Sequence, residues 1–233
     1  MQRQFTRFPL VLPLQHRVPG HPLSGAAVGW THNLSGGGAC LELAEPLQPQ
    51  LSLGLRLQTS GGPIEAEARV VWTRNPRPAE GGSLHGIAFT QLAPDHLEVL
   101  RRLLLSLQPW RRTQVRFPVD LAVICQPQRP PGPLYSSRVS DISRGGLALR
   151  LPEVLLPFTA LDVTLPTPAG RLSLAGEIAW VDRPEGRRRG RLIRHGMRFA
   201  RLDWSTALVL ARLLAEALNS PQLSSPEVRT TPR

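Results

Sequence analysis

Apolar and polar residues alternate along several short stretches of the chain, a pattern typical of β-strands that bury one face. The stretches fall into two series, namely residues 39–43, 51–57 and 65–72, and residues 147–151, 161–165 and 172–180. Clusters of Gly and Pro at 60–63 and 167–170 separate neighbouring stretches and suit hairpin turns. Short strands joined by such turns predict small antiparallel β-barrels.

Two further apolar runs, residues 10–14 and 119–124, precede these series. Pro9 and Pro118 stand directly before the runs. Because proline disfavours a helix at these places, we predict that both runs are strands as well.

A helical pattern closes each series. In residues 94–107 leucines recur at three- and four-residue steps, while Arg101 and Arg102 fall on the opposite side. Residues 204–218 show a similar pattern. A helix of this kind usually covers an open face of a barrel, although it can also pack on a second copy of the chain. A homodimer is therefore an alternative that the pattern leaves open.

The two series are copies of each other. Four separate blocks recur in register after 108 to 110 residues. The blocks are residues 3–9 and 112–118, 33–38 and 141–146, 71–72 and 179–180, and 85–89 and 195–199. Their agreement indicates an internal duplication. We therefore predict a mainly β chain with one domain over residues 1–110, a second over 111–219 and a disordered tail over 220–233.

The charge of the chain narrows the range of partners. All 28 basic side chains are arginine, and they outnumber the 17 acidic ones to give a net charge of +11. This excess favours anionic partners such as phosphates or nucleic acid, although the complete lack of lysine also suggests a GC-rich coding bias. Nucleic-acid binding is the weaker alternative, because the sequence contains no helix-turn-helix or zinc-finger pattern and only 5% aromatic residues.

The sequence gives no sign of a metal site, a catalytic site or a membrane span. Cys40 and Cys125 lie in apolar stretches without metal-ligand spacing, and His85 and His195 are expected to be packing residues. The sequence shows no nucleophile with a positioned base and no Walker pattern, so we predict a non-enzyme without metal or cofactor. It also shows no apolar run of roughly 20 residues and no secretory signal, so we expect no membrane span and a cytoplasmic protein.

Two repeated groups of residues carry the candidate chemistry. The first group is a pair of arginines, with three residues between them, at the start of each copy. The pairs are Arg3 with Arg7 and Arg112 with Arg116. A guanidinium pairs with phosphate or with O6 and N7 of guanine, and its flat face stacks on a base. Two of them on a short extended arm can therefore clamp a nucleotide.

The second group follows in what we predict to be a loop between strands. It consists of Asn33, Ser35 and Gly38 in the first copy and of Asp141, Ser143 and Gly146 in the second. Asn and Asp bond their own backbone in turns, and glycine permits the close approach of a ligand. A carboxylate such as that of Asp141 also accepts hydrogen bonds from N1 and N2 of guanine. A turn explains the glycines, but it does not explain the repeated pairing with two arginines upstream.

The combination of Arg-x-x-x-Arg with Asp/Asn-x-Ser-x-x-Gly resembles the signature of PilZ domains, which are bacterial receptors for cyclic di-GMP. The likeness covers residues 3–108 and 111–218 and implies two six-stranded antiparallel β-barrels, each closed by a C-terminal helix. It also implies that the arginines hold guanine and phosphate and that the second group holds guanine. The implied binding residues are Arg3, Arg7, Asn33, Ser35 and Gly38, and Arg112, Arg116, Asp141, Ser143 and Gly146.

The resemblance implies a non-enzymatic receptor. On binding cyclic di-GMP, the chain would change the arrangement of its domains and signal to a downstream protein partner. A second hypothesis is that one or both copies are protein-interaction modules that bind no nucleotide, although both motifs are intact. Whether a site takes one ligand or an intercalated pair is open.

We predict that the second copy binds cyclic di-GMP more tightly than the first. Asp141 is charged where the first copy has the neutral Asn33, and charge-assisted hydrogen bonds are roughly twice as strong as neutral ones. The arm that follows a helix also loses less entropy on binding than the arm that holds Arg3. In separate titrations, Arg116→Ala should therefore remove more of the affinity than Arg7→Ala. Equal losses in the two variants would contradict this ranking.

Overall fold

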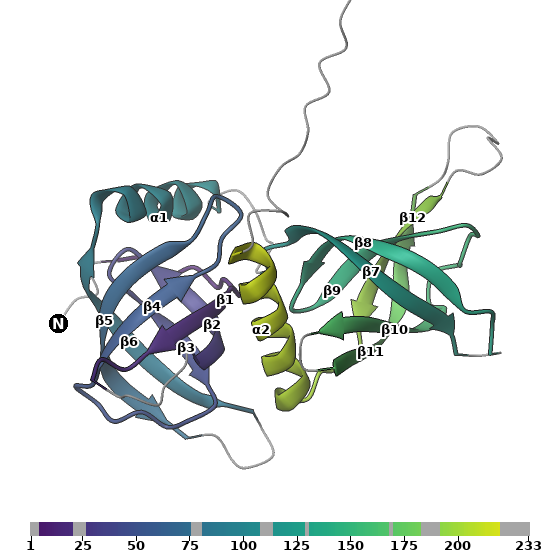
Figure 1. The fold of residues 1–233 in the computed structure, drawn as a ribbon. Coiled ribbons are helices and arrows are strands. Elements are labelled where there is room, and N and C mark those ends of the chain that lie inside the picture. Colours follow the sequence, from purple (N-terminus) through teal and green to yellow (C-terminus); the bar gives the residue numbers. More distant parts are fainter. Residues whose placement is uncertain are drawn as a thin grey trace, which may run out of the picture.

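The computed structural model describes residues 5–20, 27–75, 81–107, 114–128, 131–167, 170–182 and 192–219. Within these ranges the chain forms two closed antiparallel β-barrels of six strands, each followed by a helix (Figure 1). The tandem-barrel fold predicted from the sequence is therefore confirmed. The tail predicted to be disordered, residues 220–233, lies outside the described residues.

The first barrel closes when β4 pairs with β1, in the spatial order β1-β2-β3-β6-β5-β4. Its strands are β1 (Pro13–Arg17), β2 (Ala27–Ser35), β3 (Gly38–Leu43), β4 (Ser52–Leu57), β5 (Ile64–Arg74) and β6 (Ser83–Leu92). The helix α1 (Pro94–Ser106) follows and packs against β5 of the same barrel.

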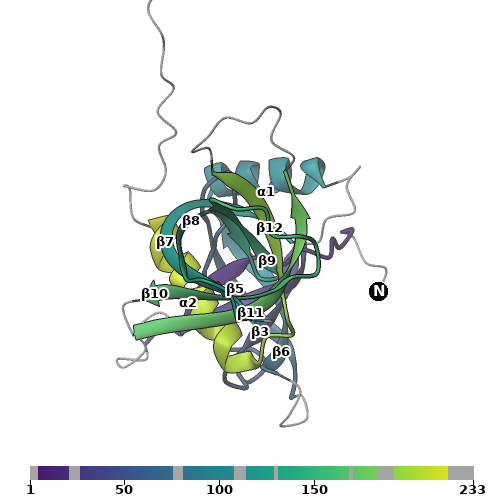
Figure 2. The same ribbon diagram turned by 90° about the vertical axis from the view of Figure 1, so that its right-hand side faces the viewer.

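The second barrel repeats this order with β7-β8-β9-β12-β11-β10, and β10 pairs with β7 (Figure 2). Its strands are β7 (Phe117–Pro127), β8 (Tyr135–Ser143), β9 (Gly146–Leu151), β10 (Ala160–Thr167), β11 (Gly170–Val181) and β12 (Ile193–Phe199). The helix α2 (Trp204–Asn219) follows it in the chain.

The alternating pattern of the sequence produces the cores. In β5, the side chains of Ile64, Ala66, Ala68 and Val70 are buried, whereas those between them are more exposed. Burying one aliphatic side chain of the larger kind contributes about 1.5–3 kcal/mol, so each barrel gains its stability mainly from its inward-facing rows.

The apolar run at residues 10–14 differs in structure from the prediction. We predicted a strand at residues 10–14, but β1 begins only at Pro13, although Leu10 and Leu12 are fully buried. The side chain of Thr31 takes over the pairing here: its Oγ1 accepts the Leu12 N–H at 2.9 Å and donates to the Leu10 carbonyl at 2.6 Å. Residues 10–12 thus fill the core ahead of β1, and the Thr31 N–H also donates to the Leu12 carbonyl at 2.9 Å. Its counterpart at 119–124 lies within β7, as predicted.

The helix α2 lies between the two barrels and contacts β1 and β2 of the first as well as β11 of its own (Figure 1). The indole Nε1 of the fully buried Trp30 in β2 donates to the Ala207 carbonyl in α2 at 2.9 Å. At the other end of α2, Asn219 Oδ1 accepts from Arg56 at 3.0 Å and from Gln58 at 3.1 Å, both on the first barrel. The last element of the chain therefore completes the packing of the first barrel.

Three histidines are buried inside the barrels, namely His16, His85 and His195. Nε2 of His85 accepts the Leu47 N–H at 2.9 Å, and Nε2 of His195 accepts the Leu155 N–H at 3.0 Å. The two repeated histidines thus hold the loops that follow β3 and β9, which agrees with the predicted packing role. Burial lowers the pKa of all three, and that of His16 falls to about 4, with the charge of His85 as a smaller cause.

These lowered pKa values predict that acid destabilises the protein. In the unfolded chain a histidine has a pKa of about 6.5, so below that pH the unfolded state binds protons that the folded state does not. The stabilisation is therefore fully present above about pH 6.5 and is lost as the pH falls towards the folded pKa, which for His16 is about 4. Denaturant unfolding at a series of pH values should show this decline, with a smaller slope in His16→Gln. A free energy of unfolding that is constant between about pH 7 and about pH 5 would contradict the prediction.

Candidate functional site

In both copies the arm that carries the arginines runs beside the end of one strand. The Phe8 N–H donates to the Leu34 carbonyl in β2 at 2.8 Å, and the Leu34 N–H donates back at 2.9 Å. Phe117 pairs in the same way with Ile142 in β8. The arginine before each phenylalanine therefore lies next to the strand that carries the second group, with its side chain exposed. These arginines are Arg7 and Arg116, whereas Arg3 and Arg112 lie outside the described residues.

The second group of residues lies on a β-hairpin and not in a loop. Residues 33 and 35 belong to β2, residues 141 and 143 belong to β8, and Gly38 and Gly146 begin the next strands. The predicted loop is therefore wrong except for two turn residues in each copy, 36–37 and 144–145. In each hairpin the register of the two strands shifts just before the turn, and the strands then stay paired up to the turn. The Asn or Asp, the Ser and the Gly of the motif therefore belong to the paired strands.

The serine and the glycine of each motif are explained by the hairpin itself. Ser35 Oγ donates to the Gly38 carbonyl at 3.0 Å, and Ser143 Oγ donates to the Gly146 carbonyl at 3.2 Å. A Cβ atom on Gly38 would lie 2.1 Å from a backbone oxygen of β6, and one on Gly146 would lie 2.2 Å from a backbone oxygen of β12. Glycine is therefore needed at both positions because the neighbouring strand leaves no room for a side chain.

In the second copy, two arginines converge on one carboxylate. Oδ1 of Asp141 is 2.6 Å from Nη1 of Arg116, and Oδ2 is 2.7 Å from Nη2 of Arg194 in β12. The Asp141 side chain is 14% exposed, whereas those of the arginines are 38% and 44% exposed. The Arg194 guanidinium also lies over the ring of Trp180, 5.4 Å from its centroid. The result is a fixed acceptor flanked by two guanidinium groups that remain open to solvent.

Sequence reasoning missed Arg194. Arg194 immediately precedes the repeated block 195–199, and the first copy has Leu84 at the corresponding position. A search for residues shared by the two copies therefore passes over it. Its pairing with Asp141 spans 53 positions of the chain and depends on the closure of the barrel, so a local pattern cannot show it.

The first copy shares the backbone of this site but not its charges. Asn33 Oδ1 is buried and has no hydrogen-bond partner among the described residues. The ring of Phe5 lies over the turn, since Cβ atoms on Gly36 and Gly37 would approach it to 3.1 Å and 2.7 Å. The Asn33 position is therefore neutral, and an aromatic ring covers the turn that follows it, whereas the second copy has an ion-paired carboxylate at Asp141.

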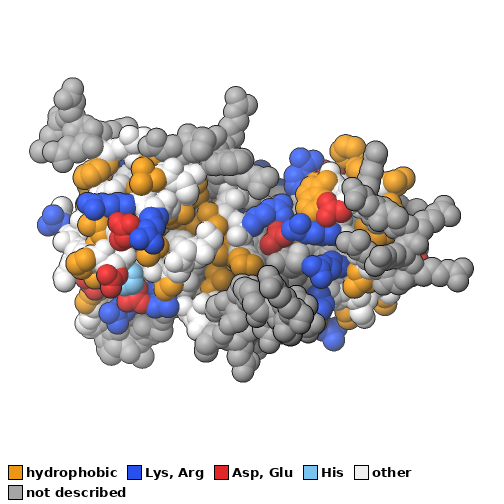
Figure 3. Space-filling view, turned by 90° about the horizontal axis from the view of Figure 1, so that it is seen from above, with side chains coloured by type: hydrophobic (Ala, Val, Ile, Leu, Met, Phe, Trp, Pro, Cys, Tyr) orange, Lys and Arg blue, Asp and Glu red, His pale blue; other side chains and the backbone are white. Residues whose placement is uncertain are grey.

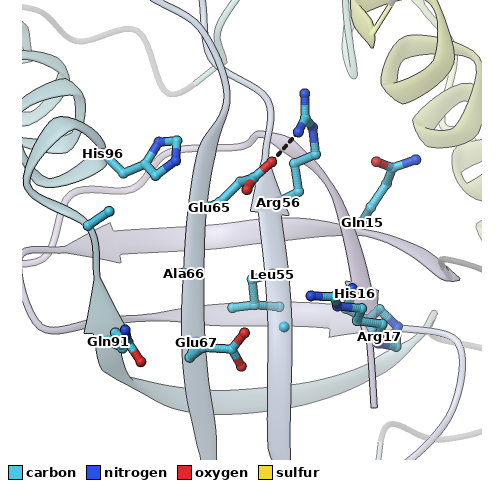
Figure 4. Close-up of a pocket in the computed structure, with 12 residues that line it drawn as sticks. Gln15, His16, Arg17, Leu55, Arg56, Glu65, Ala66, Glu67, Gln91 and His96 are labelled. Atoms are coloured by element: carbon cyan, nitrogen blue, oxygen red, sulfur yellow. Dashed lines mark hydrogen bonds and ion pairs between the residues drawn. The ribbon is translucent and has the colours of Figure 1, made fainter. Parts of the chain in front are cut away.

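A cavity of about 480 Å³ lies elsewhere on the first barrel, across β1, β4 and β5 (Figure 4). The polar side chains around it include Gln15, Arg17, Glu67 and the ion pair of Arg56 with Glu65. None of the predicted binding residues lines this cavity. In the second copy, the side chains of Arg116 and Arg194 are instead partly open to solvent at the end of the β-hairpin.

Comparison with models of known protein families tests the family resemblance that the motifs suggest. The family model described as "PilZ domain" matches residues 1–106 and again residues 111–216. The chain belongs to the PilZ domain family. Both PilZ domains are thus present in tandem, as the resemblance implied.

Solved structures of PilZ proteins resemble the chain at low sequence identity. The PilZ domain of YcgR from Escherichia coli, described with c-di-GMP, has 17% identity and a TM-score of 0.40 over 47% of this chain and 93% of its own. PlzA of Borreliella burgdorferi, in complex with c-di-GMP, has 14% identity and a TM-score of 0.37 over 87% and 88%. The inhibitor of motility MotI of Bacillus subtilis has 10% identity and a TM-score of 0.38 over 91% and 98%. The family assignment rests on the family model, and no curated protein matches the chain.

Two further features of the described residues bear on the site. Within the described ranges, no group of three or more His, Cys, Asp or Glu side chains is placed to hold a metal ion. No helix in the same ranges is long and apolar enough to span a bilayer.

The packing of the second PilZ domain predicts that its two adjacent glycines respond differently to substitution. Gly146→Ala should lower the stability by about 1–3 kcal/mol, because the added Cβ meets a backbone oxygen of β12. Gly145→Ala is the matched control, since its Cβ meets only the flexible end of the Gln114 side chain. Urea unfolding of the two variants measures the difference. Equal midpoints would show that the packing of β12 does not impose glycine at 146.

Proposed function

We propose that this tandem PilZ protein is a non-enzymatic receptor for cyclic di-GMP, which changes the arrangement of its two domains on binding and signals to a downstream protein. The single observation that carries the proposal is the acceptor Asp141, held between Arg116 and Arg194 at the end of β8. The two proposed sites comprise Arg3, Arg7, Asn33, Ser35 and Gly38, and Arg112, Arg116, Asp141, Ser143 and Gly146. To the second site we add Arg194.

The chemistry of these groups suits a guanine nucleotide. Each oxygen of the Asp141 carboxylate keeps a free lone pair after pairing with one arginine, so it can accept the N1 and N2 protons of guanine. The flanking guanidinium groups of Arg116 and Arg194 can then pair with phosphate or stack on the base. A ligand with two guanines and two phosphates offers both kinds of partner at once.

The differences between the two copies support sites of unequal affinity for cyclic di-GMP. The first site has a neutral amide at Asn33 and Leu84 in place of Arg194, so it offers guanine no charged acceptor and one cation fewer. It is therefore the weaker site, in line with the ranking derived from the sequence.

The high net charge by itself does not favour nucleic acid as the ligand. On the face shown in Figure 3, basic side chains lie next to acidic ones on both barrels. Arg102 pairs with Glu98 at 2.8 Å, and Arg138 pairs with Asp120. A duplex-binding surface needs arginines free to neutralise phosphates along a stripe, and pairs of this kind reduce that number.

Calorimetric titration with cyclic di-GMP tests the proposal, with GTP and cyclic di-AMP as ligand controls. We expect selective binding to the wild-type chain. In Arg112→Ala/Arg116→Ala, binding to the second site should be lost, and the remaining stoichiometry reports the first site. Arg194→Leu, which installs the residue of the first copy, should weaken the second site in the same direction.

The matched control is Arg138→Ala, which removes an exposed arginine of the same barrel outside the site. It should bind like the wild type if the effect belongs to the site and not to the net charge. Absence of binding in folded wild-type protein would overturn the proposal and favour an interaction module.

A further inference from the structure

The turn after β8 belongs both to the proposed second site and to the contact between the barrels. Arg144 stands between Ser143 and Gly145, and its Nη1 lies 2.8 Å from Oε2 of Glu42 in β3 of the first barrel. Its guanidinium carbon lies 5.3 Å from the centroid of the Trp30 ring in β2. One residue of the second motif is therefore attached directly to the first barrel.

Glu42 is an unusual acceptor because its side chain is only 8% exposed. Its Oε2 also lies 3.0 Å from Nε2 of His32. Burial by itself raises the pKa of this carboxyl, but hydrogen bonding to His32 and the charge of Arg144 outweigh burial and lower it. Loss of the Arg144 charge would leave a buried carboxylate short of a partner, so this pair matters more than an exposed one.

The ring beneath Arg144 is rigidly held. Trp30 is fully buried, and its Nε1 is bonded to the Ala207 carbonyl of α2. A guanidinium over the face of an indole gains a cation–π interaction, which is stronger where the groups are partly desolvated. Arg144 is 24% exposed, so it is fixed by the ion pair and by the ring together.

The turn itself does not need an arginine. The first copy has Gly36 at the corresponding position, and its serine closes the turn in the same way. The Arg144 side chain thus adds a contact with the other barrel to a turn that forms without it.

The arginine arm of the second site is attached to the first domain as well. Gln114, which lies between Arg112 and Arg116 in the sequence, pairs with Val11 in a parallel β-bridge. Its side-chain Oε1 lies 3.4 Å from Ser143 Oγ. Both parts of the second site, the arm and the turn, are therefore held by contacts that cross between the domains.

We propose that Arg144 is a positioning residue that couples cyclic di-GMP binding at the second PilZ domain to the docking of that domain on the first. The inference rests on the proposed function. With Arg144 docked on Glu42 and Trp30, the turn beside Ser143 is already held in place against the first barrel, so the ligand does not have to hold it there. Because coupling between sites is reciprocal, the ligand in turn shifts the two domains towards this docked arrangement.

The test changes the first barrel and measures the second site. Arg7→Ala serves as the reference protein, in which binding is confined to the second site. Adding Glu42→Gln should weaken cyclic di-GMP binding about 5- to 10-fold, although residue 42 lies outside the proposed ligand contacts. Adding Glu98→Gln is the matched control in the same domain, and it should leave the affinity within about twofold, because that carboxylate is 50% exposed and pairs with Arg102 of its own helix.

A second measurement separates coupling from general damage to the fold. In the reference protein, saturating cyclic di-GMP should slow hydrogen exchange in β2 and β3 of the first barrel. In Arg7→Ala/Arg144→Ala this protection should disappear, even at ligand concentrations that restore full occupancy. A purely structural role for Arg144 would leave the ligand-dependent protection in place.

The outcomes distinguish the two proposals. If the reference protein folds but binds no cyclic di-GMP, the proposed function of the second site fails. If it binds, and Glu42→Gln has the same affinity as Glu98→Gln or ligand protects β2 and β3 without Arg144, the function stands and the coupling is wrong.

Discussion

The packing of α2 is the interaction on which the arrangement of the molecule depends. Its buried residues are Ala207, Leu210, Ala211, Leu213, Leu214, Ala215 and Ala217. A helix that is apolar around much of its circumference needs cover on more than one side. A single barrel face cannot supply that cover, whereas a position between two barrels does. This position also brings the turn at 144–145 next to Glu42 and Trp30, so the helix core and the polar contacts between the barrels support each other.

The two copies keep one backbone and differ in their charges. Both hairpins use a serine to close the turn and a glycine to pass beside the neighbouring strand. Around that shared frame, the second copy has Asp141, Arg144 and Arg194 where the first has Asn33, Gly36 and Leu84. The shared residues close and pack the hairpin, whereas the differing residues give the second copy the ion pairs of Asp141 and the contact of Arg144 with the first barrel. Differences between repeats are therefore as informative about function as their similarities.

The sequence predicted the fold well, because period-two alternation depends only on neighbouring residues and the repeat follows directly from comparing the chain with itself. Local patterns were less successful where a contact spans the chain. The motif residues look like a loop because Asn, Ser and Gly favour turns, yet pairing with the adjacent strand extends the ladder to residue 35 and to residue 143. The apolar face of residues 204–218 predicts a buried helix, but not that Trp30 of the other domain would be its partner. Arg194 meets its partner through the closure of its barrel and Arg144 through the docking of the two barrels, so the sequence alone gives no sign of either contact.

The place of α2 has a consequence for how the chain acquires its structure during synthesis. The strands of the first barrel leave the ribosome long before residues 204–219, which cover the outer side of β1 and β2. Until residues 204–219 have been synthesised, the first barrel therefore carries an uncovered apolar surface, of the kind that chaperones recognise and that promotes aggregation. The two halves share one repeated pattern, but the packing of the first half is completed only by a helix that is made after the strands of the second.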